Sequence, residues 1–278
     1  MNPIEPSEIK IKELISLFDK KKFNELLKLS NELLDNFPKS ILLQNIQGVV
    51  HTELKNYKIA KDLFIKVVKL NPKYTDGFYN LANIFIKLNE EEKAIENYNK
   101  VIELDKNYFK AHNNLGNIYR RKGLNKKAIE CYLSTLEINP NYKVAYYNLA
   151  GALQFYKINE ENKNINKYLL YLLKEKIIVR PNSIAQNVLN SLFLNTDLKK
   201  NLSLIKYKIA NKDFKYILEN LQENSLLIQF MKVCPISDYF IEKNFVNIRK
   251  EILNQTYKSD IDKTHINFLI SLSMQCFL

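Results

Sequence analysis

The sequence predicts an all-α fold made of repeated helix pairs, and three observations support this prediction. Only 5 glycines and 7 prolines occur in 278 residues, which leaves few sharp turns and argues against a many-stranded sandwich or barrel. With 46% hydrophobic and 26% charged residues, the composition is that of a folded chain. Pro38 and Pro72 are 34 residues apart, and Pro140 follows after twice that distance. A fixed period of this length indicates repeated structural units.

Several further columns of residues follow the 34-residue period. A small residue recurs at Gly48, Ala82, Gly116 and Ala150. An alanine recurs at Ala60, Ala94 and Ala128, and an aromatic residue follows four positions later at Phe64, Tyr98 and Tyr132. Small side chains let two helices cross closely, and an aromatic residue one turn further along the same face fills the remaining gap. Each repeat should therefore contain two packed helices, the second ending near its proline, which lacks an amide donor.

The period divides the chain into repeats. Three regular repeats are expected at residues 41–74, 75–108 and 109–142. Residues 1–40 should form a degenerate N-terminal repeat that caps the array, because Leu26 and Ser30 replace the usual alanine and aromatic residue.

The C-terminal half is less regular. A degenerate repeat is expected at residues 143–180, and the 34-residue register is lost after Lys157. Apolar runs such as the one around Leu169 and Leu173 predict further helices outside the repeat. Residues 181–278 are expected to form a helical region that is truncated, because the apolar pattern of residues 265–278 stops without a helix-ending signal.

One repeat carries the signature of a known family. His112, Leu115, Gly116 and Tyr119, followed by Ala128, Tyr132 and Pro140, resemble the tetratricopeptide repeat family. The resemblance covers residues 7–156 and implies a right-handed α-solenoid of helix pairs, followed by a non-repeating helical region. It also implies a scaffold that binds a protein or an extended peptide in its concave groove. The family's clamp for a C-terminal carboxylate is not reproduced, because Asn45, Tyr79 and Asn113 occupy positions where a lysine would be needed.

An asparagine recurs in the first helix of successive repeats, at Asn80, Asn114 and Asn148. Its amide offers a donor and an acceptor, which suits the backbone of an extended peptide. The run is similar to the asparagine ladder in the repeat domain of O-linked N-acetylglucosamine transferases. The alternative is that each asparagine bonds to a neighbouring helix. The rest of the expected peptide-binding lining is Tyr79, Asn83, Asn113, Asn117, Arg120, Arg121 and Tyr147.

No catalytic motif is visible, so no catalytic residue, cofactor or metal is expected. His51 and His112 occupy positions that the repeat assigns to packing. Cys131, Cys234 and Cys276 are expected to be reduced, because three distant cysteines fit neither a disulfide framework nor a zinc site. As an alternative, residues 237–278 resemble the linker of bacterial repeat–methyltransferase fusions. The chain would then be the N-terminal, substrate-recruiting portion of a longer methyltransferase- or glycosyltransferase-type enzyme.

The charge and the termini bear on partners and location. The net charge is +12, but only four of the 42 basic residues are arginines, which phosphate-reading proteins favour. Nucleic acid is therefore not an expected partner. No apolar run reaches the roughly 18 residues of a membrane span, and the first residues do not resemble a signal peptide. A cytoplasmic protein with no membrane contact is expected.

Overall fold

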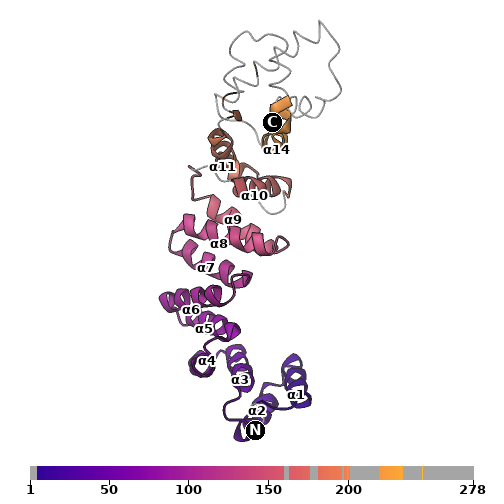
Figure 1. The fold of residues 1–278 in the computed structure, drawn as a ribbon, viewed down its shortest axis with the longest axis vertical. Helices are drawn as coiled ribbons and strands as arrows, with labels where there is room; N and C mark the ends of the chain where they lie inside the picture. The colour runs from indigo at the N-terminus through magenta and orange to yellow at the C-terminus, as the bar shows by residue number, and fades with distance from the viewer. Residues whose placement is uncertain are drawn as a thin grey trace. The chain divides into compact units, whose positions relative to one another are not determined.

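The computed structural model describes residues 5–159, 163–175, 181–195, 197–198, 200, 219–233 and 246. Within these residues all regular secondary structure is helical, which confirms the all-α fold class. The chain divides into two compact units, Met1–Lys122 and Gly123–Leu278, called here the first and the second unit. Figure 1 labels their helices along the chain.

The first unit consists of helices that pair in sequence order. They are α1 (Glu8–Asp19), α2 (Phe23–Asn36), α3 (Ile41–Glu53), α4 (Tyr57–Leu70), α5 (Thr75–Lys87), α6 (Glu91–Leu104) and α7 (Phe109–Arg121). Each helix packs against the next, and α3 also contacts α5, so the first helices of successive pairs lie side by side. The helix α4 ends two residues before Pro72, as the sequence predicts.

The small and aromatic columns of the repeat form the contacts inside each pair. Ala60 and Phe64 in α4 are buried, as are Ala94 and Tyr98 in α6. Gly48 of α3 lies against the Phe64 ring, where a β-carbon on residue 48 would be 2.6 Å from Cε1 of the ring. The prediction that small residues mark close helix crossings is therefore confirmed at Gly48.

The turn inside each helix pair contains one residue with a left-handed backbone conformation, which the sequence does not predict where that residue is not glycine. Lys21, Lys55 and Asn89 have φ angles of 56°, 60° and 60°, in the left-handed region. These residues are 34 positions apart, and Gly123, the next in the series, has a φ of 72°. The pair α1–α2 therefore has the same turn as the regular repeats, although its packing columns are degenerate.

A carboxylate that precedes α1 caps the start of α3. Oε1 of Glu5 accepts hydrogen bonds from the backbone N–H groups of Ile41, at 2.9 Å, and Leu42, at 3.4 Å, and its Oε2 accepts one from the Ser40 hydroxyl. The Ser40 hydroxyl in turn accepts from the N–H of Leu43 at 3.1 Å. The free N–H groups of a helix start are stabilised by such acceptors.

The second unit begins with the continuing repeat and goes on to other helices. They are α8 (Asn125–Ile138), α9 (Lys143–Leu153), α10 (Lys163–Lys174), α11 (Pro181–Leu194) and α14 (Ser225–Val233). The helices α10 and α11 both contact α9, and α14 packs against both of them. In α10, Leu169 and Leu173 are buried, which confirms the helix predicted around them.

A buried asparagine fixes the end of α9. Asn187 of α11 donates from Nδ2 to the Leu153 carbonyl oxygen at 2.6 Å, and its Oδ1 accepts from the N–H of Ile158 at 3.0 Å. Nearby, the rings of Tyr146 and Tyr171 stack with centroids 4.1 Å apart. These contacts hold α9, α10 and α11 together after the repeat register is lost.

Some expectations from the sequence remain predictions. Cys234, Cys276 and the linker-like residues 237–278 lie outside the described residues, apart from residue 246. The division at residues 40, 142 and 180 also stays a prediction.

Candidate functional site

Two asparagines on adjacent first helices bond to each other. Asn80 of α5 donates from Nδ2 to Oδ1 of Asn45 in α3, at 3.0 Å. Both side chains are half-buried. Within the part of the chain that the structure describes, no hydrogen bond occupies Nδ2 of Asn45 or Oδ1 of Asn80. The pair therefore keeps the unused NH₂ group of Asn45, the second N–H of Asn80 and the unused carbonyl oxygen of Asn80.

The next asparagine along the array, Asn114 of α7, lies in a denser network. Its Nδ2 is 3.2 Å from each of three oxygens, the hydroxyls of Tyr79 and Tyr98 and Oδ1 of Asn83. Tyr98 donates to Oδ1 of Asn83 at 2.5 Å. The Tyr98 hydroxyl is protonated at neutral pH, as any tyrosine with an ordinary pKa is, and burial raises its pKa further, so it remains a donor. The two protons of the Asn114 amide are therefore committed to this network.

Aromatic rings and one carboxylate flank the network. The Tyr79 ring centroid is 5.0 Å from that of Tyr108 and 5.9 Å from that of Tyr98. Tyr108 donates from its hydroxyl to Oδ1 of Asp76 at 2.8 Å. Burial, followed by this hydrogen bond to a carboxylate, raises the pKa of Tyr108. We use the name polar face for Asn45, Tyr79, Asn80, Asn83 and Asn114.

The predicted basic residues lie at the end of α7. Arg121 is already paired, because its Nη2 is 2.8 Å from Oε1 of Glu91 in the first turn of α6 and its Nε donates to the same oxygen at 2.9 Å. Lys122 pairs with Glu92, whose hydrogen bond raises the pKa of the lysine. Arg120 is exposed. Arg121 therefore has a counter-ion on a neighbouring helix, and the contact of Arg120 and Arg121 with a peptide stays a prediction.

Four other predicted lining residues have different surroundings. Asn113 is only 2% exposed and donates to Oδ1 of Asn114 at 3.4 Å, so a guest does not reach it. This corrects its predicted position on an open surface, and the reason is that its side chain is packed between helices. Asn117 is half-buried in α7. Tyr147 and Asn148 lie in α9 of the second unit, where Tyr147 is exposed and Asn148 half-buried.

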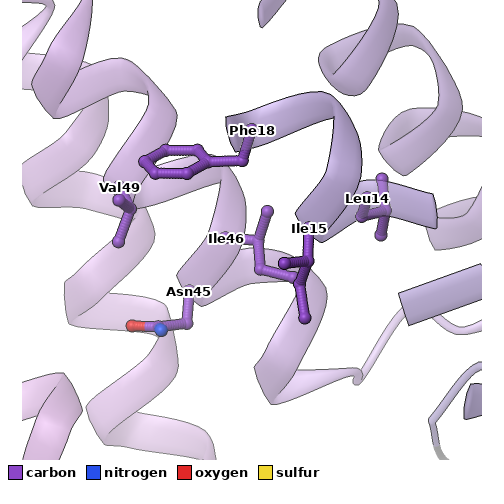
Figure 2. Close-up of a pocket in the computed structure, with 6 residues that line it drawn as sticks. All are labelled: Leu14, Ile15, Phe18, Asn45, Ile46 and Val49. Carbon is purple, nitrogen blue, oxygen red and sulfur yellow. The ribbon is translucent and has the colours of Figure 1, made fainter. Parts of the chain in front are cut away.

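An apolar hollow lies between α1 and α3, beside the polar face. It has a volume of about 150 Å³. Its lining residues are Leu14, Ile15 and Phe18 of α1 and Asn45, Ile46 and Val49 of α3, drawn in Figure 2. The repeat pattern in the sequence does not predict this hollow. Its one signal in the sequence is the amphipathic pattern of α1, which leaves Ile15 on the solvent side.

The described residues were compared with the requirements of a metal site and of a membrane-spanning helix. Among the described residues no group of three or more His, Cys, Asp or Glu side chains is placed to hold a metal ion. His112 lies with Nε2 3.1 Å from the carbonyl oxygen of Lys106, within hydrogen-bond distance of its own loop. No described helix combines the length and apolar character needed to cross a membrane.

Comparison with known proteins identifies the repeats. Family models described as tetratricopeptide repeat match residues 43–74 and 109–142, and one described as TPR repeat matches residues 82–123. This is a tetratricopeptide repeat protein, with its repeats in residues 43–142. The fold, the family motif and the 34-residue turn series therefore agree.

Solved structures show the same fold. A crystal structure of MamA protein is 20% identical with a TM-score of 0.50, and the match covers 73% of this chain and 95% of that one. MamA (41-end) from Desulfovibrio magneticus RS-1 is 16% identical with a TM-score of 0.50, over 68% of this chain and 95% of that one. At these identities the likeness of this tetratricopeptide repeat protein to MamA concerns the fold alone.

A curated relative matches a shorter stretch. The ATP synthase subunit delta of Clostridium botulinum (strain Kyoto / Type A2) is 27% identical over 95 residues, which are 34% of this chain. The match spans 53% of that protein, about half its length.

Proposed function

We propose that this tetratricopeptide repeat protein is an interaction scaffold that binds an extended segment of a partner protein along the polar face, on the concave side of the array. The repeats themselves support a general role as a protein-interaction module. The proposal that the partner is an extended segment bound along the polar face rests on the hydrogen-bonded amides of Asn45 and Asn80, called here the amide pair.

The amide pair supports backbone recognition. A peptide group offers one N–H donor and one carbonyl acceptor, and the pair has complementary groups unused, the NH₂ group of Asn45 and the carbonyl oxygen of Asn80. Their mutual hydrogen bond fixes both amides before a guest arrives, which lowers the cost of ordering them on binding. Because both groups would read only the backbone, such a site grips an extended chain without selecting its side chains.

The structure also gives weight to the packing alternative. Two asparagines of the polar face donate to a neighbouring helix, Asn80 to Asn45 and Asn114 to Tyr79, and Asn83 accepts from Asn114. We assign Asn114 chiefly to holding α5, α6 and α7 together, because both of its amide protons are committed. Within the first unit, Asn80 is the residue of the predicted ladder that retains capacity for a guest, together with its partner Asn45.

A double variant tests the proposal. Asn45→Ala with Asn80→Ala should weaken capture of peptides selected from a random phage-displayed library by at least about tenfold, since each lost hydrogen bond contributes roughly 0.5–1.5 kcal/mol. The array should lose only about 1 kcal/mol of stability, because one hydrogen bond between helices disappears. Thermal melts by circular dichroism measure this second effect. Adding Asn148→Ala tests the contribution of the second unit.

The matched control replaces two asparagines whose amides bond only to their own helices. Asn36 donates to the Glu32 carbonyl and Asn97 to the Lys93 carbonyl. The double change of these two residues to alanine should leave capture unaltered. Equal capture by the wild-type chain and the Asn45/Asn80 variant, or a variant that unfolds, would mean that the amide pair serves packing.

The enzymatic alternative stays a prediction. The same face could recruit a substrate for a catalytic domain in a longer protein, and reading the gene beyond the codon for Leu278 decides that point. The cytoplasmic location and the absence of a nucleic-acid partner are likewise predictions.

A further inference from the structure

We propose that the hollow between α1 and α3 receives one large apolar side chain of the bound segment, so that the partner is an extended peptide with a leucine, isoleucine or phenylalanine anchor. This inference rests on the proposed function, because the anchor and the amide pair would hold the same peptide. The hollow would select for one side chain of the peptide, whereas the amide pair would contact only the peptide backbone.

The lining of the hollow is suited to an apolar group. Five of its six lining residues are apolar, and the sixth is Asn45. Ile15 is 50% exposed, so apolar surface at the hollow remains in contact with water. In Figure 2 the Phe18 ring reaches from α1 toward Val49 on α3. Covering these side chains would remove apolar surface from water, which favours binding.

The volume restricts the size of the occupant. At about 150 Å³, the hollow is comparable to apolar cavities that accept a benzene molecule. One phenylalanine ring or one branched aliphatic side chain is therefore the matching size. A charged side chain would lose its hydration against the apolar lining without gaining a counter-ion from it.

The position of Asn45 favours an extended peptide over other apolar partners. Asn45 lines the hollow and also belongs to the amide pair, so the two sites share one residue. Its unused Nδ2 is one turn along α3 from Val49, where it can donate to a backbone carbonyl next to the anchor. A helix from a second copy of this chain has its carbonyls engaged within the helix, whereas an extended segment has them free.

Selection from a library gives the first readout. A phage-displayed library of random peptides is panned against the full wild-type chain, and the recovered sequences are read. We expect one leucine, isoleucine or phenylalanine at a fixed place in the enriched peptides, and replacement of that residue by alanine should weaken binding of the synthetic peptide by at least about tenfold. Enriched peptides with no apolar preference would overturn the inference.

A pair of variants with matched exposure gives the second readout. Ile15→Asp should weaken binding of the selected peptide by at least about tenfold, and it should have little further effect on the alanine-substituted peptide. Ile59→Asp is the control, because Ile59 lies on α4, outside the hollow, and is 49% exposed. It should bind as the wild-type chain does. Equal weakening by both variants, or none by Ile15→Asp, would contradict the anchor.

The outcomes separate this inference from the proposed function. Peptides that require Asn45 and Asn80 but tolerate Ile15→Asp would overturn the anchor alone, whereas failure to enrich any peptide would overturn both. If Ile15→Asp unfolds by circular dichroism, Ile15→Trp, which fills the hollow from its rim, takes its place with the same expected loss. If sedimentation velocity shows that the wild-type chain is a dimer and that either variant is a monomer, the hollow would instead be the contact with a second copy of this chain.

Discussion

Gly48 of α3 and Phe64 of α4 are in such close contact that a β-carbon on residue 48 would lie 2.6 Å from one ring carbon of Phe64 and 2.8 Å from another. Real β-carbons do not approach other atoms so closely, so any side chain at residue 48 must displace the ring or separate the two helices. The closest crossing in the first regular repeat therefore depends on a glycine.

The first prediction concerns this contact. Gly48→Val should destabilise the array by roughly 1–3 kcal/mol, because the added atoms overpack the helix crossing. Urea unfolding followed by circular dichroism measures the change. Combining Gly48→Ala with Phe64→Leu should cost less than the sum of the single changes, because a smaller side chain at residue 64 makes room. Strict additivity would show that the two residues do not share this space.

The second prediction concerns the asparagine that holds the end of α9. Asn187→Leu leaves the Ile158 N–H without a partner, while the Leu153 carbonyl keeps the N–H of Tyr156 at 3.4 Å, so a loss of roughly 2–4 kcal/mol is expected, about 1–3 kcal/mol for the orphaned N–H and about 1 kcal/mol for the second lost hydrogen bond. Asn190→Leu in the same helix is the contrast, because Nδ2 of Asn190 is buried with no partner among the described residues. That change should be neutral or stabilising. Similar losses in urea unfolding for both variants would refute the assigned role.

The third prediction concerns the one cysteine within the described residues, Cys131. Burial, and to a smaller extent the Glu130 carboxylate, raises the pKa of the Cys131 thiol to about 12. At pH 8 the folded protein should therefore react with iodoacetamide at Cys131 roughly 100-fold or more slowly than the unfolded chain, because only the thiolate attacks. Peptide mapping by mass spectrometry, with and without guanidinium, gives both rates. Labelling of the native protein at the unfolded rate would contradict the assignment.

The same shift has a consequence for stability. Since the folded pKa lies above the unfolded value of about 8.5, the thiol's contribution is fully present below that pH and is lost as the pH rises toward 12. A Cys131→Val variant should therefore lose less stability than the wild-type chain between about pH 9 and pH 11. Parallel thermal melts across that interval provide the comparison.

Much of the fold could be predicted because packing repeats with the sequence period. Ala60, Ala94 and Ala128 are all buried, as their shared position requires. The turn residues could not be predicted in the same way. Lys55 and Asn89 adopt a left-handed conformation without being glycine, because the helices on either side fix the turn.

The candidate site was less accessible to prediction. The spacing of Asn80 and Asn114 correctly places both on first helices, yet it does not reveal that one amide pairs with Asn45 and the other with two tyrosines and Asn83. Those partners come from other helices, so they depend on the packed structure. The hollow was missed because Ile15 and Phe18 belong to the degenerate repeat, where no column of the period points to them.

The Glu5 carboxylate, which precedes the first helix pair, caps the first helix of the second pair, so the start of α3 depends on a residue of the preceding repeat. A fragment that begins at Ile41 would keep every apolar contact of its own repeat and still lose the acceptors from Glu5 and Ser40 at the start of α3. A hybrid array that grafts α1 and α2 onto foreign repeats would carry an unmatched acid unless the recipient helix also began with free N–H groups at that point. A unit that can be moved between arrays without losing contacts therefore does not coincide with one 34-residue repeat, because the start of α3 needs Glu5 from the preceding repeat. Hybrid arrays should be joined at a point that keeps Glu5 and the start of α3 together.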